Sequence, residues 1–236
     1  MSAPLTAMVL AAGLGQRMRP ITDRCPKPLV RIGGRPMLDH ALGRLEQAGI
    51  ARAVVNVHHL AGQIEAHLGQ VRGVAVTVSD ERDALLETGG GVKRALPLLG
   101  PEFLVMNSDS LWTERQESNV GRLLAAWDPA RMDALLLLAD RDSLGYDGAG
   151  DFDLDATGRL ARRRPGGVAP HVYAGVGILK ASSFQDTPDG AFSLNLVFDR
   201  AIAADRLYGL RLDGEWLHVG TPDAIRAAEE RLAATR

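Results

Sequence analysis

The stretch from Leu10 to Pro28 holds the residues whose types and spacing best suit chemistry. It combines two glycines, Gly13 and Gly15, with two well-spaced cations, Arg17 and Lys27. Glycine lets a ligand approach the backbone because it has no side chain, and Arg and Lys form strong hydrogen bonds with anions. We therefore expect a large anionic group, such as a phosphate chain, to bind here.

The prolines that flank Lys27 strengthen this expectation. Two glycines alone indicate little, because tight turns commonly use Gly-x-Gly. Pro26 and Pro28 fix φ and stiffen the backbone on both sides of Lys27, which favours a positioned ammonium group. The alternative is an exposed loop whose cations only face solvent.

The whole pattern resembles the signature of the sugar-1-phosphate nucleotidylyltransferases, which join a nucleoside triphosphate to a sugar phosphate and release pyrophosphate. The resemblance implies that the glycine loop wraps the nucleotide, that Arg17 holds its triphosphate and that Lys27 faces the sugar phosphate. The matching residues are Gly13, Gly15, Arg17, Pro20, Thr22, Pro26, Lys27 and Pro28. The nucleotide-binding residues implied in this stretch are Leu10, Ala11, Ala12, Gly13, Gly15 and Arg17.

A second glycine-rich stretch, Glu87-Thr88-Gly89-Gly90-Gly91, opens a predicted helix. Each glycine inside a helix lowers helix stability by roughly 1 kcal/mol relative to alanine, so a run of three needs another reason. We expect that these glycines let the backbone approach a ligand, and a plain loop is the alternative. The resemblance implies that Glu87, Thr88 and Gly89 lie against the base and ribose. This form is most similar to that of uridylyltransferases acting on N-acetylmuramate 1-phosphate, whereas mannose-type guanylyltransferases more often have Gly-Thr-Ala-Gly.

Asp109 is the first candidate metal ligand. It follows an apolar strand predicted over 103–107, and ligands bind beyond the carboxyl ends of parallel strands. Mg²⁺ prefers oxygen ligands, although a turn-forming Asp would look the same. The family places a magnesium-binding Asp at this position. The resemblance therefore implies catalytic roles for Arg17, Lys27 and Asp109 and a nucleotide contact for Asn107. Mn²⁺ is the other candidate ion.

His218 departs from the family pattern. The segment 216–222 resembles the family's closing Trp-x-Asp-Val-Gly-Thr, but a histidine stands at the position of the second acidic ligand. A neutral imidazole suits Zn²⁺ or Mn²⁺ better than Mg²⁺. His218 therefore ligates the metal, bonds a phosphate or a metal-bound water, or is structural; these three readings stay open.

Strands and helices alternate along the first 140 residues, which predicts right-handed crossovers and a mainly parallel sheet. We expect strands over 7–10, 53–57, 74–78, 103–107 and 134–139, helices beginning near Pro36, Leu60 and Glu87 and over 118–127 and 192–204, an edge strand over 207–212 and a last helix from Pro222. The fold class is α/β, and the resemblance implies a Rossmann-like sheet flanked by helices (nucleotidyltransferase type A) with a small antiparallel sugar-binding lobe. We expect a single domain over 1–236, with the nucleotide-binding part in 1–140 and the lobe in 141–236.

The lobe carries the weakest signals. A hairpin over 151–160 should turn near Thr157-Gly158. By resemblance only, the sugar contacts fall on Gly150, Asp151, Tyr173 and Gly175. The three arginines at 162–164 suggest a solvated edge, with a contact to an acceptor carboxylate as the alternative.

Composition excludes several classes of function. The net charge is −2 without a basic tract, which argues against nucleic-acid binding. The single cysteine, Cys25, cannot form an internal disulfide, and we interpret it as a spectator. No leader pattern and no apolar run of about 20 residues is visible, so we expect a cytoplasmic protein that does not bind membranes.

The resemblance implies in-line transfer of a uridylyl group from UTP to a sugar 1-phosphate, with N-acetylmuramate 1-phosphate as the expected acceptor. Such an enzyme would serve peptidoglycan sugar recycling and receive its substrate from a sugar kinase. The alternatives are another pair, such as GTP with mannose 1-phosphate, and an inactive regulatory subunit that binds a sugar nucleotide. The oligomeric state cannot be read from the sequence.

Overall fold

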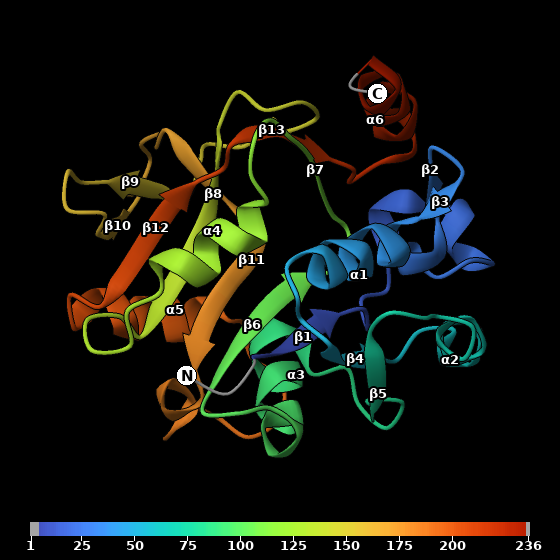
Figure 1. The fold of residues 1–236 in the computed structure, drawn as a ribbon, viewed down its shortest axis with the longest axis horizontal. Coiled ribbons are helices and arrows are strands. Elements are labelled where there is room, and N and C mark those ends of the chain that lie inside the picture. Colours follow the sequence, from blue (N-terminus) through green and yellow to red (C-terminus); the bar gives the residue numbers. More distant parts are fainter. Residues whose placement is uncertain (1–4, 235–236) are drawn as a thin grey trace.

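A computed structural model describes residues 5–234 of the chain. Its main sheet has nine strands, and its order along one path is β10-β9-β11-β6-β1-β4-β5, with β8 and β12 continuing from β11 (Figure 1). The strands are β1 Thr6–Leu10, β4 Arg52–Val57, β5 Ala75–Asp80, β6 Glu102–Asn107, β8 Ala134–Asp140, β9 Phe152–Leu154, β10 Leu160–Arg162, β11 His171–Lys180 and β12 Leu207–Arg211.

The sheet is parallel where the nucleotide-binding part was expected. β1 pairs in parallel with β4 and β6, and β4 with β5. β11 runs antiparallel to β6 and β8, with an irregular register between Tyr173 and Gly177. This confirms a mainly parallel α/β sheet with antiparallel additions, and the β9–β10 hairpin turns at Asp155–Gly158 as predicted. The sheet runs across residue 140, and the division into two functional parts stays a prediction.

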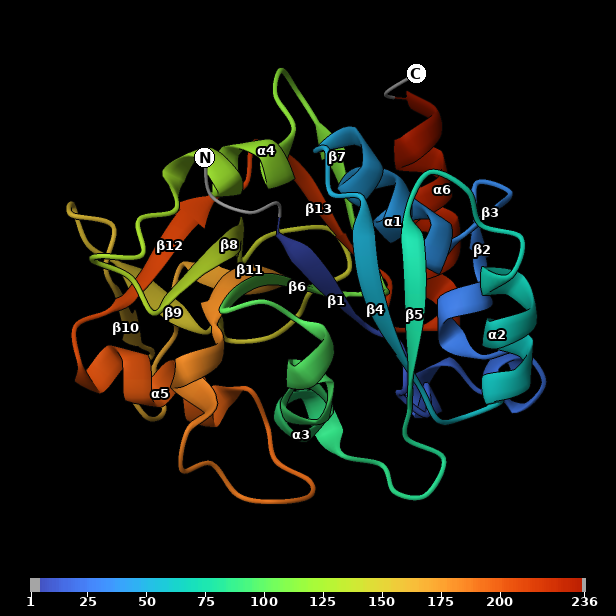
Figure 2. The same cartoon turned by 60° about the horizontal axis from the view of Figure 1, so that its bottom comes forward.

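Helices cover both faces of the sheet (Figure 2). Alternate residues of β1 face opposite ways: Ala7 and Val9 join the core under α1, α2 and α4, whereas Met8 joins the core under α3 and α5. Leu38 and Leu45 are fully buried on α1, as the helical spacing predicted. The helices are α1 Met37–Gln47, α2 Ala61–Leu68, α3 Glu87–Ala95, α4 Asn119–Ala126, α5 Asn195–Ala203 and α6 Pro222–Ala234.

A third, smaller core ties the start of the chain to its end. Met18 and Ile32 pack there with Leu217 and Ala228, which joins the signature stretch to α6. Beside it, β7 Ser110–Glu114 pairs antiparallel with β13 Gly214–His218, and β2 Arg31–Ile32 pairs with β3 Arg35–Pro36. The sequence patterns did not predict these short ladders, but the first of them places His218 opposite Ser110, just beyond β6.

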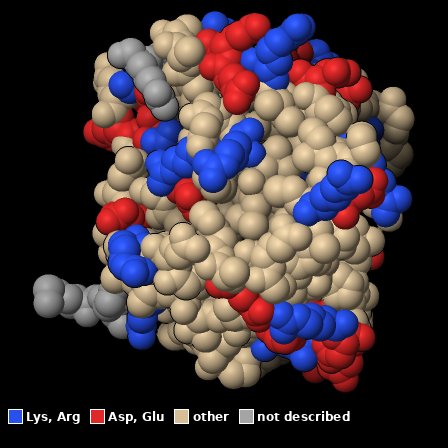
Figure 3. All heavy atoms as spheres, turned by 90° about the vertical axis from the view of Figure 1, so that its right-hand side faces the viewer, with Lys and Arg blue, Asp and Glu red and all other residues tan. Residues whose placement is uncertain are grey.

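Charges of both signs are mixed on the surface. Figure 3 shows one face, on which lysine and arginine lie beside aspartate and glutamate around a broad uncharged area. Such a face has no extended basic stripe of the kind that binds nucleic acid. Within residues 5–234, no helix is both long and apolar enough to span a bilayer.

Candidate active site

A cavity of about 420 Å³, here called the nucleotide cavity, lies at the carboxyl ends of β1 and β6. This is the edge of a parallel sheet at which ligands bind. It gathers ten of the predicted site residues from three separate stretches of the chain. They are Leu10, Ala11, Ala12, Gly13, Gly15, Lys27, Glu87, Thr88, Asn107 and Asp109.

The two glycines of the signature have different surroundings. Gly15 has φ +63°, and a Cβ there would lie 2.8 Å from Cγ2 of Thr22 and 3.2 Å from Cβ of Lys27. A side chain at Gly15 would therefore displace the turn that carries Lys27. Gly13 is different, because no atom of the described residues lies within 4 Å of a Cβ at that position. The space over Gly13 is open to a ligand.

Lys27 and Asp109 form an ion pair on the wall of the nucleotide cavity. Lys27 begins a short 3-10 turn between two prolines, and Asp109 follows β6. Their side chains are 14% and 32% exposed, so both are largely shielded from water. Burial acts to raise the pKa of Asp109, but the charge and hydrogen bond of Lys27 outweigh it and lower the pKa below its usual value. Asp109 is therefore ionised at neutral pH.

His218 and Arg17 lie close together, and neither forms part of the wall of the nucleotide cavity. A Cβ on Gly220 would lie 2.8 Å from Nε2 of His218 and 3.4 Å from Nη1 of Arg17, so both side chains border this glycine. Burial lowers the pKa of His218, with a smaller contribution from Arg17 and an opposing one from Asp109. The imidazole is therefore neutral at pH 7.

Two aromatic rings fix the orientation of His218. Its ring centroid lies 5.0 Å from that of Trp216 and 5.9 Å from that of Tyr146, in the second case edge to face. Its backbone N–H donates to the carbonyl of Leu144 at 2.9 Å. Strand β13 and the loop after β8 therefore jointly position the His218 side chain.

The donor set fits a hard divalent cation that takes most of its ligands from substrate. No cluster of three or more His, Cys, Asp or Glu side chains suited to a metal occurs within the described part of the chain. Asp109 offers an ionised carboxylate and His218 a neutral ring nitrogen. Mg²⁺ is commonly bound by one or two carboxylates with phosphates and waters completing its shell, which Asp109 fits; the softer imidazole of His218 stays a predicted ligand.

The three glycines of α3 have another explanation than the one expected from the sequence. A Cβ on Gly89 would collide with the Phe192 ring, and one on Gly90 with the carbonyl of Gly190. The glycines thus admit protein rather than a ligand. Gly89 also lies outside the wall of the nucleotide cavity, while Glu87 and Thr88 form part of it.

The four residues expected at the sugar are held by the protein itself and do not line the nucleotide cavity. Asp151 accepts a hydrogen bond from the N–H of Tyr173 at 2.9 Å. Gly150 and Gly175 have φ +78° and +79°, and a Cβ at either would collide with Ala169 or Ser110 respectively. A Cβ on Gly175 would also lie 2.8 Å from Nδ2 of Asn107, so this residue adjoins the nucleotide cavity. Their contact with a sugar stays a prediction.

The arginines and the cysteine outside the site agree with the structural alternatives. Arg162 bonds Asp199 at 2.6 Å and lies over the Phe152 ring, and Arg163 donates to the carbonyl of Gly150 at 3.0 Å. Burial raises the pKa of the Cys25 thiol, which keeps it protonated and unreactive.

Sequence reasoning missed part of the cavity wall. Asn56 lines the cavity because it lies near the carboxyl end of β4. The alternation of strands and helices along the sequence could have indicated this position. Ser193 reaches the wall through the loop before α5, and nothing in its local sequence indicates this. The further lining residues are Pro28, Asn56, Leu85, Ser108 and Ser193.

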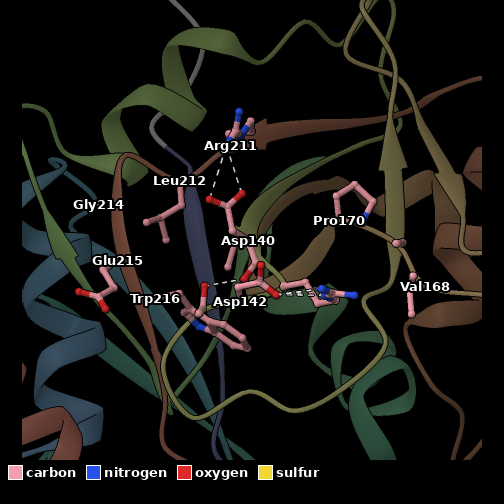
Figure 4. A pocket seen from close by; sticks show the side chains of 13 residues that line it. Asp140, Asp142, Val168, Pro170, Arg211, Leu212, Gly214, Glu215 and Trp216 are labelled. Carbon is pink, nitrogen blue, oxygen red and sulfur yellow. Dashed lines mark hydrogen bonds and ion pairs between the residues drawn. The ribbon is translucent and has the colours of Figure 1, made fainter.

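A second cavity of about 670 Å³ is larger but contains none of the predicted site residues. It lies between the loop after β8, the loop at 168–170 and the β12–β13 connection (Figure 4). Four of its charges are paired with each other, Arg211 with Asp140 at 3.2 Å and Arg141 with Asp142 at 3.0 Å, and Glu215 pairs with Arg231. The predicted site residues therefore gather in the smaller cavity.

Solved structures share this fold. The inositol-1-phosphate CTP transferase from T. maritima matches with a TM-score of 0.80 and 18% identity, over 99% of this chain and 96% of that one. A UDP-glucose pyrophosphorylase solved with UDP-glucose matches with a TM-score of 0.81 and 14% identity, over 99% and 100%. The fold is therefore that of the α/β nucleotidyltransferases.

Sequence comparison makes the assignment more specific. The model of the nucleotidyl transferase family matches residues 6–137, and the chain belongs to this family. It is 49% identical to the N-acetylmuramate alpha-1-phosphate uridylyltransferase of Caulobacter vibrioides, over 98% of both chains. It is 36% identical to the enzyme of the same name from Neisseria meningitidis serogroup B, over 95% of this chain and 97% of that one.

Proposed function

We propose that the protein transfers a uridylyl group from UTP to N-acetylmuramate 1-phosphate and releases pyrophosphate. The observation that carries the chemistry is the Lys27–Asp109 ion pair on the wall of a glycine-lined cavity at the carboxyl end of a parallel sheet. The choice of substrates is supported by similarity to two uridylyltransferases along nearly the whole chain.

The reaction is an in-line displacement. A phosphate oxygen of the sugar 1-phosphate forms a bond to the α-phosphorus of UTP, the bond from that phosphorus to the bridging oxygen breaks, and pyrophosphate leaves. The attacking oxygen is ionised at neutral pH, so no general base is needed. Catalysis then consists of positioning two polyanions and neutralising their charge.

The chain's own cations have separate tasks in this scheme. Lys27 offsets the repulsion between the incoming phosphate and the nucleotide, and Arg17 binds the β- and γ-phosphates. Asp109 and His218 would hold the divalent cation, Mg²⁺ or Mn²⁺. When bound, such an ion neutralises phosphate charge. The backbone around Gly13 leaves room for the phosphates.

The acceptor would meet Gly150, Asp151, Tyr173 and Gly175, next to Asn107. With N-acetylmuramate 1-phosphate as the acceptor, the protein would act in peptidoglycan sugar recycling in the cytoplasm, after a kinase that phosphorylates the anomeric hydroxyl of the free sugar.

A pyrophosphate-release screen tests the proposal. UTP, GTP, CTP and dTTP are each combined with the 1-phosphates of N-acetylmuramate, N-acetylglucosamine, glucose and mannose, with Mg²⁺ and then Mn²⁺. We expect strong release only with UTP and N-acetylmuramate 1-phosphate. Release with GTP and mannose 1-phosphate would keep the mechanism and overturn the substrates, and no release in any combination would favour a binding subunit.

A further inference from the structure

A buried hydrogen-bonded chain runs beneath the nucleotide cavity. The N–H of Ala11 donates to Oδ1 of Asn56 at 2.7 Å, and Nδ2 of Asn56 donates to Oε1 of Glu81 at 2.8 Å. Asn56 is 2% exposed and Glu81 is fully buried. The three residues lie at or just beyond the carboxyl ends of β1, β4 and β5, which are neighbours in the sheet.

Burying the Glu81 carboxyl group at this place costs free energy of folding. Its Oε2 has no hydrogen-bond partner of ordinary geometry within residues 5–234, and burial raises its pKa against the lowering effects of Asn56 and of the backbone N–H of Leu86. A buried carboxyl group without full partners commonly destabilises a fold relative to an apolar residue. Glu81 also lies outside the wall of the nucleotide cavity, so it is not placed to bind the ligand itself.

The orientation of the Asn56 amide depends on Glu81. The oxygen and the nitrogen of an amide have nearly the same size, so its partners decide which way it points. The carboxyl oxygen of Glu81 accepts a hydrogen bond from Nδ2, which turns Oδ1 toward the N–H of Ala11. Ala11 is the first residue after β1, where the glycine loop begins.

Helix α3 packs closely against Glu81 and Asn56. A Cβ on Gly91 would lie 2.7 Å from Oε1 of Glu81 and 2.8 Å from Nδ2 of Asn56. Only glycine allows the helix to cover the two polar groups at this distance. The third glycine of the Gly89–Gly91 run is therefore explained by Glu81 and Asn56.

We propose that Glu81 is a positioning residue for the nucleotide: it sets the Asn56 amide, which fixes Ala11 and thereby the start of the phosphate-facing glycine loop. This inference rests on the proposed nucleotide site but not on the identity of the sugar. Glu81 acts through Asn56, so the two residues should not contribute independently to nucleotide binding.

The test measures binding of UTP with Mg²⁺ by calorimetry, together with KM and kcat. Glu81→Leu removes the acceptor, and we expect the Kd and KM for UTP to rise about tenfold, the scale of losing one buried hydrogen bond. The KM for the sugar phosphate should stay within about twofold, since its predicted contacts are elsewhere. Glu81→Gln keeps an acceptor and should restore binding to within about threefold of wild type.

A double-mutant cycle distinguishes action through Asn56 from direct contact. Asn56→Ala should weaken UTP binding at least as much as Glu81→Leu, and adding Glu81→Leu to it should change little more. Fully additive losses, or unchanged UTP binding in Glu81→Leu, would overturn the proposal. If Glu81→Leu fails to fold, Gly91→Ala takes its place, because its Cβ would push the pair apart.

Asn119→Ala is the matched control. Asn119 is also fully buried and bonds the backbone of Asp213 twice, at 2.8 and 2.9 Å, away from the cavity. It should lower the free energy of unfolding as Asn56→Ala does but leave the Kd for UTP unchanged, and an equal rise in Kd would overturn the proposal. Measuring the binding of GTP, CTP and dTTP to wild type separates the proposed substrates from the proposed role of Glu81. If another nucleotide binds better than UTP, the proposed substrate is wrong, and that nucleotide replaces UTP in the tests of Glu81. If no nucleotide binds, both proposals are overturned.

Discussion

The region around Gly13 and the region around Gly150 are both rich in glycine, but the glycines have opposite surroundings. The space over Gly13 is open, whereas side chains at Gly150 and Gly175 would collide with Ala169 and Ser110. In the first region glycine leaves room for a ligand, and in the second it lets protein segments approach each other. A glycine in a sequence therefore does not say whether it leaves room for a ligand or lets protein segments pack closely.

The same comparison extends to charge. The nucleotide side carries the Lys27–Asp109 pair, with Arg17 and His218 nearby. On the acceptor side, the N–H of Tyr173 is bonded within the protein to Asp151, whereas the Tyr173 hydroxyl has no partner among the described residues. We therefore expect substitutions on the nucleotide side to change turnover and those on the acceptor side to change stability or acceptor binding.

The largest effect should come from Lys27→Ala. Loss of one preorganised charge-stabilising donor lowers kcat by about a hundredfold or more, which steady-state kinetics at saturating substrates would measure. Lys93→Ala is the control, because Lys93 also forms an ion pair, with Asp189 at 2.8 Å, but lies outside the cavity wall. Near-normal turnover in Lys27→Ala would remove the assigned role.

His218→Ala tests the second cation ligand. We expect the Mg²⁺ concentration for half-maximal activity to rise about tenfold, the usual cost of weakening a metal site. His67→Ala, which breaks a His–Asp contact of 2.5 Å outside the cavity wall, should not change it. An unchanged magnesium requirement in His218→Ala would assign the imidazole to a phosphate or to structure alone.

A pair of identical substitutions tests the contrast between the glycines directly. Gly13→Ala should leave the melting temperature unchanged but raise the Kd for UTP about tenfold, because the methyl group enters the space for the ligand. Gly150→Ala should lower the free energy of unfolding by about 1–3 kcal/mol, because φ is +78° there. If the contrast between the two glycines is wrong, urea unfolding will show a loss of stability in Gly13→Ala and calorimetry will show a higher Kd for UTP in Gly150→Ala.

Tyr173→Phe tests the acceptor side. The hydroxyl of Tyr173 is buried without a hydrogen-bond partner among the described residues, and burial raises its pKa. Removing it should raise the free energy of unfolding by up to about 1 kcal/mol. If the hydroxyl bonds the sugar, the KM for the sugar phosphate rises while that for UTP does not, and an unchanged KM would take Tyr173 out of the acceptor site.

The smallest effect concerns pH and Glu81. A raised pKa in the folded state means that the folded protein binds the proton more tightly than the unfolded chain. The free energy of unfolding of wild type relative to Glu81→Gln should therefore fall as the pH rises above about 4.3, until the folded carboxyl ionises. The change is about 1.4 kcal/mol per unit of pKa difference, and urea unfolding between pH 4.5 and 8 measures it. A difference that does not vary with pH would contradict the raised pKa.

The sequence could predict the nucleotide side because its residues lie in short contiguous stretches. Residues 10–28, 87–88 and 107–109 each follow or precede a regular element, and parallel strands bring their ends to one edge. The role of Gly91 could not be read, since it depends on Glu81 and Asn56, which approach it only in the fold.

Residues that reach their places through long-range contacts were harder to predict for a physical reason. β7 and β13 are far apart in the chain, and each gains its partner only through long-range pairing. The position of Ser193 depends on the loop that carries Phe192 against Gly89. Local propensity contains no signal for such contacts, so in residues 141–234 the sequence patterns predicted only the hairpin around Thr157-Gly158, the edge strand β12 and the approximate bounds of the helices.

The position of β11 has a consequence for how the protein is made. It fills the place beside β6, yet it is synthesised later than β8 and the β9–β10 hairpin. At 5–20 residues per second, the roughly 70 residues from the end of β6 to the end of β11 take about 4 to 15 s. During this time one edge of β6 has no native neighbour, and nascent chains should be most prone to aggregate or to recruit chaperones in that window.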